Sequence, residues 1–149
     1  MKNRTKVAYL ADLAAESTAP FTTLTETHLT PDMKSAEVAI PGYTLYRSDS
    51  LGGRTHGGCA VYVRDDLTVV EKQKYCNNCC ESQVLEIEEM ELLLINIYRP
   101  PNATKQLFQE VLEKCQHAID EVLEKEKEKK YSNPSGCRRL QLPLYTVAF

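Results

Sequence analysis

The sequence predicts an α/β protein, a half-sandwich with a mainly antiparallel sheet and outer helices. Between Tyr43 and Tyr98, short segments of alternating or β-branched residues are separated by turn residues, as in strands. Apolar residues at helical spacing flank this region, before Ser17 and after Asn102. Helices and strands that each bury one face form layered α/β domains. At 149 residues the chain is one such domain or part of one.

The first two elements are a helix and a short strand. Apolar residues recur at helical spacing between residues 5 and 17, which predicts an opening amphipathic helix. These residues are Val7, Leu10, Leu13 and Ala14. The segment 21–25 reads FTTLT, and its threonines and phenylalanine favour extended backbone. We therefore predict a buried strand that ends at Glu26.

A short helix and a hairpin follow this strand. Thr30 can cap a helix with Pro31 at its first position, and this helix should end near Val38. The segments 43–47 and 59–63 have the alternation and the β-branched residues of strands, and a glycine-rich loop joins them. We expect the two segments to pair as a hairpin.

Three further strands are predicted after the hairpin. They are the segments 68–75, 82–88 and 91–98, and the last two are close enough for a tight antiparallel connection. The segment 91–98, ELLLINIY, is apolar on both faces, which is typical of a central strand. Pro100 and Pro101 should end it, because two consecutive residues without amide donors cannot continue a ladder.

A long helix follows residue 102 and ends in a charged segment. Its apolar residues form one broad stripe. They are Leu107, Phe108, Val111, Leu112, Cys115, Ile119, Val122 and Leu123. The segment 124–130, EKEKEKK, favours either a solvated helical end or a disordered linker. We therefore predict a partial domain over residues 6–123, and a charged linker with an unassigned tail over residues 124–149.

Composition and charge exclude some classes of protein. The net charge of −3 argues against a strongly basic nucleic-acid module, although five glutamates within residues 81–91 leave room for a cationic face elsewhere. The longest aliphatic run, LLLINI, is too short to span a bilayer, so we expect no membrane partner. The amino terminus lacks an apolar stretch of signal-peptide length. We expect an intracellular protein with reduced thiols, whereas six cysteines would suggest disulfides in a secreted chain.

Glu26 is the first candidate functional residue. A carboxylate at the carboxyl end of a strand in an α/β layer lies where such folds bind ligands, so it is a candidate metal or substrate group. A surface glutamate that opens a loop explains the same position, since exposed glutamates are common. The position alone leaves both interpretations open.

Five motifs, in order along the chain, resemble a known family. They are LTETHLTPD, IPGYTLYRSD, HGGCAVYVRDDL, CESQVLEIE and INIYRPPNA. Together they resemble the endonuclease/exonuclease/phosphatase superfamily, specifically the endonuclease domain of non-long-terminal-repeat retrotransposons, over residues 6–123. The resemblance implies the N-terminal half of a four-layer α/β sandwich, in which two mixed sheets face each other between outer helices.

The resemblance also implies a DNA endonuclease that cleaves phosphodiester bonds with a divalent metal, usually magnesium, and that acts in the nucleus. Glu26 matches the family's metal-binding glutamate, and Tyr98 matches the tyrosine that contacts the scissile phosphate. Asn102 is a candidate substrate-binding residue, but two prolines separate it from the family's register. Magnesium prefers hard oxygen ligands and keeps several waters, so one carboxylate with substrate phosphate oxygens is an ordinary site.

Several catalytic motifs of the family do not occur in this sequence. The asparagine at the end of the family's first strand is missing, and Asn3 should not be mistaken for it. The later Gly-Asp-Phe-Asn and Ser-Asp-His segments are missing as well. The resemblance therefore implies a catalytically incomplete fragment, for which a C-terminal half or a reverse transcriptase domain is the expected partner. The alternative is a non-catalytic truncated remnant that serves at most as a binding or interaction fragment.

A group of cysteines has the spacing of half a metal site. Cys76, Cys79 and Cys80 match the first half of a zinc knuckle, and Cys115 and Cys137 are the residues that could complete it. The alternative is ordinary buried thiols, and Cys115 belongs to the apolar stripe of the long helix.

Cationic and imidazole side chains also have two interpretations. Arginines at strand ends or in loops can hold DNA phosphates, and ordinary surface charge explains them equally well. These are Arg47, Arg54, Arg64 and Arg99. His28 follows Glu26 by two residues and could reach a substrate, or it is a surface imidazole.

Overall fold

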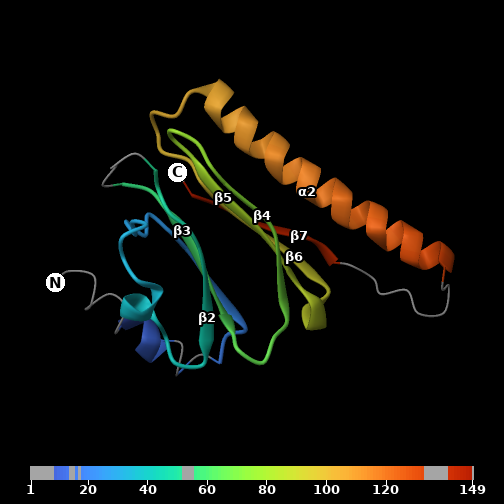
Figure 1. Ribbon diagram of the computed structural model, residues 1–149, viewed down its shortest axis with the longest axis horizontal. Coiled ribbons are helices and arrows are strands. Elements are labelled where there is room, and N and C mark those ends of the chain that lie inside the picture. The colour runs from blue at the N-terminus through green and yellow to red at the C-terminus, as the bar shows by residue number, and fades with distance from the viewer. Residues whose placement is uncertain (1–8, 14–15, 17, 52–55, 133–140, 149) are drawn as a thin grey trace.

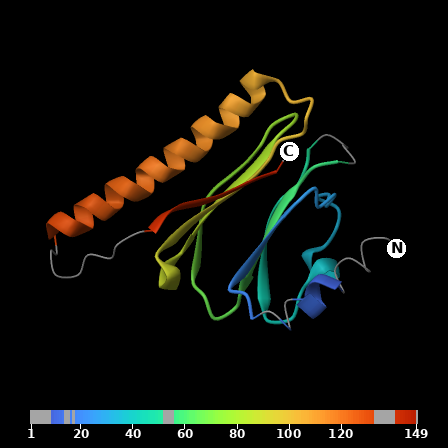
Figure 2. The same cartoon turned by 180° about the vertical axis from the view of Figure 1, so that it is seen from behind.

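Two β-sheets and a long helix are stacked in three layers (Figure 1). The computed structural model describes residues 9–13, 16, 18–51, 56–132 and 141–148. Sheet A contains β1 (Phe21–Thr25), β2 (Tyr43–Ser48) and β3 (Cys59–Arg64). Sheet B contains β4 (Val69–Cys76), β5 (Glu81–Ile87), β6 (Leu92–Tyr98) and β7 (Gln141–Ala148). The helix α2 (Lys105–Ser132) covers the outer face of sheet B, as the view from behind also shows (Figure 2).

Sheet A has the strand order β1-β3-β2 and is antiparallel throughout. The predicted hairpin is confirmed, because β2 and β3 pair from Tyr43 opposite Arg64 to Ser48 opposite Cys59. The predicted first strand is also confirmed, because β1 ends at Thr25, directly before Glu26.

Sheet B has the strand order β4-β5-β6-β7. The three strands predicted in this part of the chain are present, and β6 is central, as its apolar faces predicted. It pairs antiparallel with β5 and parallel with β7. The α/β class with mainly antiparallel pairing is thus confirmed. The prediction of a single sheet is wrong, because the strands form two sheets. Each sheet covers the inner face of the other, a face that a single sheet would expose.

Apolar side chains from both sheets fill one end of the space between them. The fully or almost fully buried members are Val61, Val63, Leu85, Ile87, Leu92 and Leu94. Partly buried residues close this end, among them Phe21, Tyr46 and Met90. Burial of this kind is the main favourable contribution to folding, at roughly 25 cal/mol per Å² of apolar surface.

A second apolar cluster joins sheet B to α2. Val84, Leu93, Ile95 and Ile97 of the sheet pack against the helix. The helical side consists of Val111, Cys115, Ala118, Ile119 and Val122. Leu112 and Leu123, which the predicted stripe includes, are 36% and 43% exposed, so the buried stripe is narrower than predicted.

The end of the chain differs from the prediction in two respects. The segment 124–130 is helical, which is one of the two alternatives considered, and the tail predicted as unassigned contains β7. The predicted boundary at residue 123 falls within α2. The domain limits 6–123 and 124–149 otherwise stay a prediction. No helix among the described residues is both long and apolar enough to cross a bilayer.

The two helices predicted before β2 differ in how far the structure contains them. The helix expected to begin at Pro31 is instead a 3-10 turn, η1 (Ser35–Val38), which ends where predicted. The carbonyl of Thr30 accepts a local turn bond from the Met33 amide and a tertiary bond from Arg47, and together they hold a turn in place of the first helical residues. Residues 9–13 of the opening helix are helical, whereas Val7 and Ala14 lie outside the described residues.

Candidate functional site

The carboxyl ends of β1 and β6 meet at one edge of the two sheets. Tyr98 is the last residue of β6, and its hydroxyl donates a hydrogen bond of 2.8 Å to Oε1 of Glu26, the residue after β1. Tyr98 is 3% exposed, whereas Glu26 is exposed. The structure therefore brings together two residues that are 72 positions apart in the sequence. Their predicted roles in metal and phosphate binding stay predictions.

The backbone after β1 turns sharply to present Glu26. Glu26 and His28 have φ values of 52° and 56°, in the left-handed region that L residues seldom adopt. The amide of Thr27 donates to the Gly58 carbonyl at 3.2 Å, and that of His28 donates to the Gly57 carbonyl at 3.0 Å. These bonds tie the turn to the start of β3, so the surrounding structure maintains its strain.

Glycine is required on the β3 side of this contact. Gly58 has φ of 88°, and a Cβ atom there would lie 2.5 Å from Oγ1 of Thr27. A Cβ atom on Gly57 would lie 3.0 Å from Oε2 of Glu81. The HGG sequence, predicted as part of a glycine-rich loop, thus permits Thr27 and Glu81 to lie close to the segment that precedes β3.

Glu81 is a buried carboxylate that the sequence did not indicate as functional. It is 0% exposed and begins β5, in register with Tyr98 on β6. The Cys76 thiol donates to its Oε1 at 3.8 Å, and the Cys59 thiol donates to its main-chain carbonyl at 3.6 Å. In the sequence Glu81 is one of several glutamates in an acidic stretch, and only its place at the start of a strand marks it.

Three of the described thiols, those of Cys59, Cys80 and Cys115, are buried. Burial, and then the negative charge of Glu81, raises the pKa of Cys59. Burial raises the pKa of Cys80 to about 12 and also raises that of Cys115. Cys76 and Cys79, the other two cysteines of the predicted zinc-knuckle half, are partly exposed. Among the described residues no group of three or more His, Cys, Asp or Glu could hold a metal ion, and Cys137 lies outside them.

Arg99 and Asn102, the predicted substrate-binding residues, lie beyond Tyr98. The guanidinium of Arg99 stacks over the Phe108 ring at 5.0 Å and donates to the Ala103 carbonyl at 3.3 Å. These contacts direct it toward the start of α2. Asn102 is exposed in the turn after β6, and no described contact joins it to Glu26 or Tyr98. Their substrate roles stay predictions.

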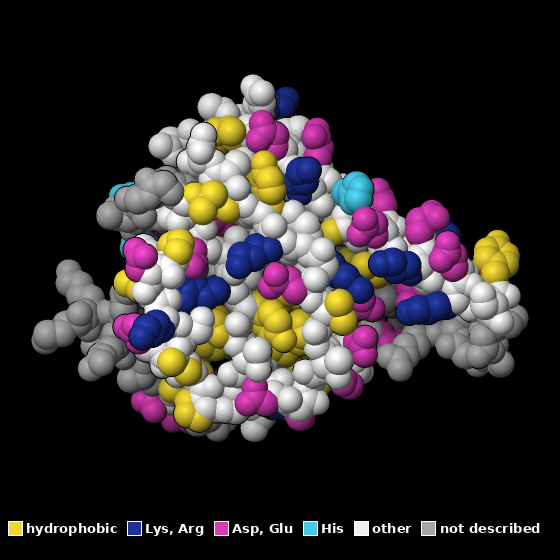
Figure 3. Space-filling model, viewed as in Figure 1, with side chains coloured by type: hydrophobic (Ala, Val, Ile, Leu, Met, Phe, Trp, Pro, Cys, Tyr) yellow, Lys and Arg dark blue, Asp and Glu magenta, His cyan; other side chains and the backbone are white. Residues whose placement is uncertain are grey.

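Two of the other arginines have structural partners. Arg47 forms a two-bond ion pair with Asp49 and donates to two main-chain carbonyls, which ties β2 to the turn before η1. Arg64 pairs with Asp66 at the opposite end of β3 from the site. Arg54 lies outside the described residues. Figure 3 shows cationic and anionic side chains interspersed on the face that carries α2, so the cationic face considered from the sequence is not on this side.

His28 has a neighbour that the sequence did not indicate. Its ring lies 5.9 Å from that of His56, centroid to centroid, in an edge-to-face arrangement. Both side chains are exposed at the rim of the site. The contact of His28 with a substrate stays a prediction.

Comparisons with known proteins find similarity at the level of solved structures. No protein-family model and no curated protein matches the sequence. The crystal structure of truncated TDP2 from Caenorhabditis elegans matches with a TM-score of 0.44 and 16% identity, over 88% of this chain and 51% of that one. A second TDP2 structure from C. elegans gives 0.44 and 16%, and its selenomethionine form gives 0.38 and 17%; each covers 88% of this chain and 39% of the other.

This chain therefore spans about half, or less, of the length of the structures it matches. At such TM-scores and identities, the likeness assigns neither a family nor an activity to it.

The donor set of the site fits a hard cation. Glu26 offers an exposed carboxylate, and within the described part of the chain the bond from Tyr98 is its one side-chain hydrogen bond. Magnesium often binds through one or two carboxylates and completes its shell with water and substrate oxygens. A metal that requires three or four protein ligands does not fit the described residues.

Proposed function

We propose that this chain forms the metal- and phosphate-contacting edge of a phosphodiesterase site of the endonuclease/exonuclease/phosphatase type, with DNA as substrate. The observation that carries the proposal is the hydrogen bond from Tyr98 to Glu26. Each residue was selected from a separate motif, and their contact at one sheet edge supports a shared role. The five ordered motifs further favour a retrotransposon endonuclease as the origin of the chain.

In this proposal Glu26 holds Mg²⁺ through a carboxylate oxygen. The cation, when bound, supplies positive charge to the phosphoryl and leaving oxygens. The Tyr98 hydroxyl is a neutral donor for a phosphate oxygen. Because a phenol has one proton to donate, Tyr98 donates either to Glu26 or to the phosphate. Substrate therefore competes with Glu26 for this hydroxyl.

We propose further that the chain alone is catalytically incomplete. It has candidates for charge stabilisation and for one phosphate contact, but the motifs in which the resembled family carries its water-activating base have no match in this sequence. General acid–base help is typically worth about 10²- to 10⁴-fold in rate. The partner that we propose is a segment that supplies the C-terminal half of such a domain, or a reverse transcriptase domain, and the nucleus is the compartment in which such a protein would act. The alternative is a remnant that binds without cleaving.

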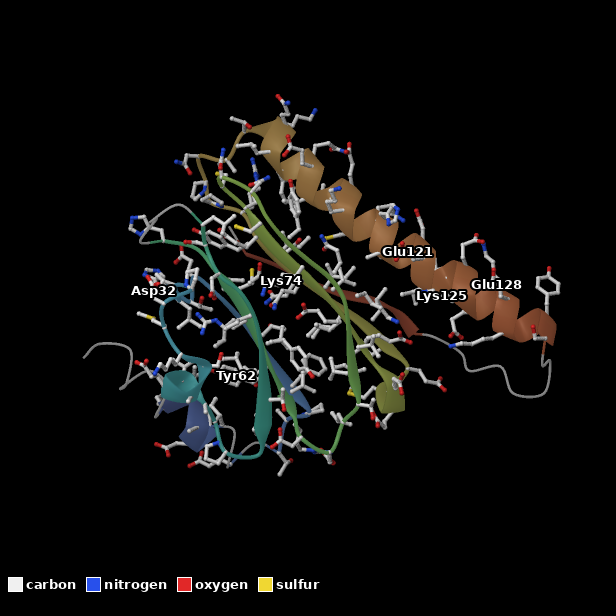
Figure 4. All side chains as sticks on the ribbon, viewed as in Figure 1. Asp32, Tyr62, Lys74, Glu121, Lys125 and Glu128 are labelled. Carbon is white, nitrogen blue, oxygen red and sulfur yellow. The ribbon has the colours of Figure 1, made fainter. Side chains whose placement is uncertain are left out.

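The proposal is tested first by metal binding. Titration of the 149-residue chain with Mn²⁺ as a probe for Mg²⁺, followed by electron paramagnetic resonance, should show weak binding that Glu26→Gln abolishes. Glu128→Gln removes an exposed carboxylate from the far end of α2 (Figure 4) and should leave the affinity unchanged. Equal binding by the Glu26→Gln variant and the unmodified chain would remove the basis of the proposal.

The second test separates binding from turnover. Supercoiled plasmid incubated with the chain and Mg²⁺ should remain uncleaved, because the motifs that carry the family's water-activating base have no match in this sequence. Tyr98→Phe should weaken Mn²⁺-dependent binding of a short duplex. Tyr62→Phe is the matched control: Tyr62 is also 3% exposed, and its hydroxyl donates to the Val38 carbonyl at 2.7 Å, on the outer side of sheet A (Figure 4). Robust plasmid nicking would contradict the predicted incompleteness, and equal effects of the two tyrosine variants would exclude a phosphate contact by Tyr98.

A further inference from the structure

A buried amide lies directly beneath the hydrogen bond between Glu26 and Tyr98. Asn96 is two residues before Tyr98 on β6, and Leu24 is two residues before Glu26 on β1. The Nδ2 atom of Asn96 donates to the carbonyl of Leu24 at 3.2 Å and to that of Ala60 on β3 at 3.2 Å. Asn96 therefore connects β6 with β1 and β3 of sheet A, one same-face position before Tyr98.

The chemistry of these bonds requires an amide. Both partners of Asn96 are carbonyl oxygens, which only accept, so the NH₂ end must face them and both of its N–H bonds are used. A carboxylate of the same shape would present acceptors to acceptors. An aliphatic side chain would make neither bond.

The position of Asn96 on its strand is also specific. Residues two apart on a strand point to the same face, and this face of β6 carries Leu92, Leu94, Asn96 and Tyr98. Asn96 is 0% exposed, as Leu94 is. On this face of β6, Asn96 is therefore the position between the apolar residues Leu92 and Leu94 and the site residue Tyr98. It carries an amide where the two preceding positions carry aliphatic side chains.

A neighbouring amide provides a comparison. Gln83 of β5 is in register with Asn96 and is also 0% exposed. Neither polar atom of the Gln83 side chain has a hydrogen-bond partner within the described residues. Of these two adjacent buried amides, Asn96 bridges the sheets and Gln83 does not.

We propose that Asn96 is a positioning residue of the candidate site. By holding β6 against β1 and β3, it sets the separation and register at which the Tyr98 hydroxyl meets Glu26 and at which Glu26 can hold a divalent cation. The metal-binding part of this inference rests on the proposed function. The positioning of Glu26 against Tyr98 does not.

The experiment uses the 149-residue chain labelled with ζ-¹³C tyrosine, with the Tyr98 resonance assigned from Tyr98→Phe. Asn96→Leu should move this resonance toward its position in Glu26→Gln and weaken Mn²⁺ affinity about tenfold, the usual scale for loss of a residue that supports a metal ligand. Gln83→Met, the matched loss of a buried amide, should leave both readouts unchanged. Thermal unfolding shows whether each variant is folded.

The outcomes separate the two proposals. If Asn96→Leu lowers the unfolding temperature but behaves like Gln83→Met in resonance and affinity, the role of Asn96 is structural alone and the inference is wrong. If the chain binds no Mn²⁺, the proposed function fails, and the Tyr98 resonance alone decides the role of Asn96. If Asn96→Leu does not fold, Asn96→Ser, which keeps one short donor, takes its place. It should shift the resonance part of the way, and no shift would overturn the inference.

Discussion

The two ends of the space between the sheets are built from the same strands but from different chemistry. At one end β3, β5 and β6 contribute Val61, Val63, Leu85, Ile87, Leu92 and Leu94, all buried. At the other end the same faces carry Cys59, Glu81, Gln83, Asn96 and Tyr98. On β6 the change occurs between Leu94 and Asn96, adjacent positions of one face.

The difference between the two ends suggests that one contributes mainly to the stability of the fold and the other to the positions of the site residues. Aliphatic side chains stabilise the fold without regard to direction, because hydrophobic burial depends mainly on area. Buried polar groups cost free energy unless they are hydrogen-bonded, but their bonds have defined directions. We infer that the apolar end supplies the free energy that holds the strands together, while the two hydrogen bonds of Asn96 at the polar end fix where Glu26 and Tyr98 meet.

The largest effect is expected at the apolar end. Leu94→Ala should lower the free energy of unfolding by about 2–5 kcal/mol, because it opens a cavity among fully buried side chains. Urea unfolding provides the measurement. Leu112→Ala makes the same change on α2, where the side chain is 36% exposed, and should cost about 0.5 kcal/mol or less. Similar losses for the two variants would contradict the assignment of stability to this end.

A glycine pair tests the close approach of β1 and β3 at the polar end. Gly42 and Gly58 have φ of 81° and 88°, so alanine at either should cost about 1–2 kcal/mol of backbone strain. Nothing lies within 4 Å of a Cβ atom on Gly42, whereas one on Gly58 would lie 2.5 Å from Thr27 Oγ1. Gly58→Ala should therefore destabilise more than Gly42→Ala in urea, and it alone should shift the Tyr98 resonance. Equal losses would show that the turn can move.

Gln83→Met should change the free energy of unfolding less than the glycine variants do, and any change should be an increase. Both polar atoms of Gln83 lack hydrogen-bond partners within the described residues, so replacing it with an apolar side chain of similar length removes a desolvation cost. The free energy of unfolding should stay within about 1 kcal/mol of the unmodified value or rise. A loss above about 2 kcal/mol would mean that Gln83 makes bonds, for example through a buried water.

The smallest effect on stability is expected for the thiols. The difference between buried and partly exposed cysteines should appear mainly in their rates of alkylation. Cys59, Cys80 and Cys115 are buried with raised pKa values, whereas Cys76 and Cys79 are partly exposed. At pH 8 an alkylating reagent should modify Cys76 and Cys79 first, as read by peptide mass spectrometry. Modification of Cys59 at the same rate would contradict the burial of the polar end.

The raised thiol pKa values also predict a dependence of stability on pH. The ordinary thiol pKa is 9.0, and that of Cys80 is about 12 in the fold. As the pH rises above about 9, the unfolded chain loses thiol protons that the folded chain retains, so the free energy of unfolding should fall. Urea unfolding between pH 8 and 10 measures this change. A Cys80→Ala variant, compared with the unmodified chain over the same range, should show a weaker decline.

The sequence by itself determined the local elements. The alternation in segments 43–47 and 59–63, the two-sided apolar character of 91–98 and the helical period after residue 102 each predicted an element that is present. Such patterns can be read locally, because the period of a helix or strand decides which side chains share a face. Glu26 was selected from its place at the end of a predicted strand and from motif resemblance, and Tyr98 from motif resemblance alone. Their spacing along the chain says nothing about their contact.

Tertiary structure decided the rest. The division of the strands into two sheets and the addition of β7 beside β6 depend on pairing between distant segments. The turn before η1 depends on the bond from Arg47 to the Thr30 carbonyl. The burial of Glu81 and the two bonds of Asn96 could not be predicted from the sequence either, because the residues that contact them are distant in the chain. Asn96 binds carbonyls 36 and 72 residues away. A periodic sequence specifies which face a residue occupies, but what that face meets depends on how the whole chain packs.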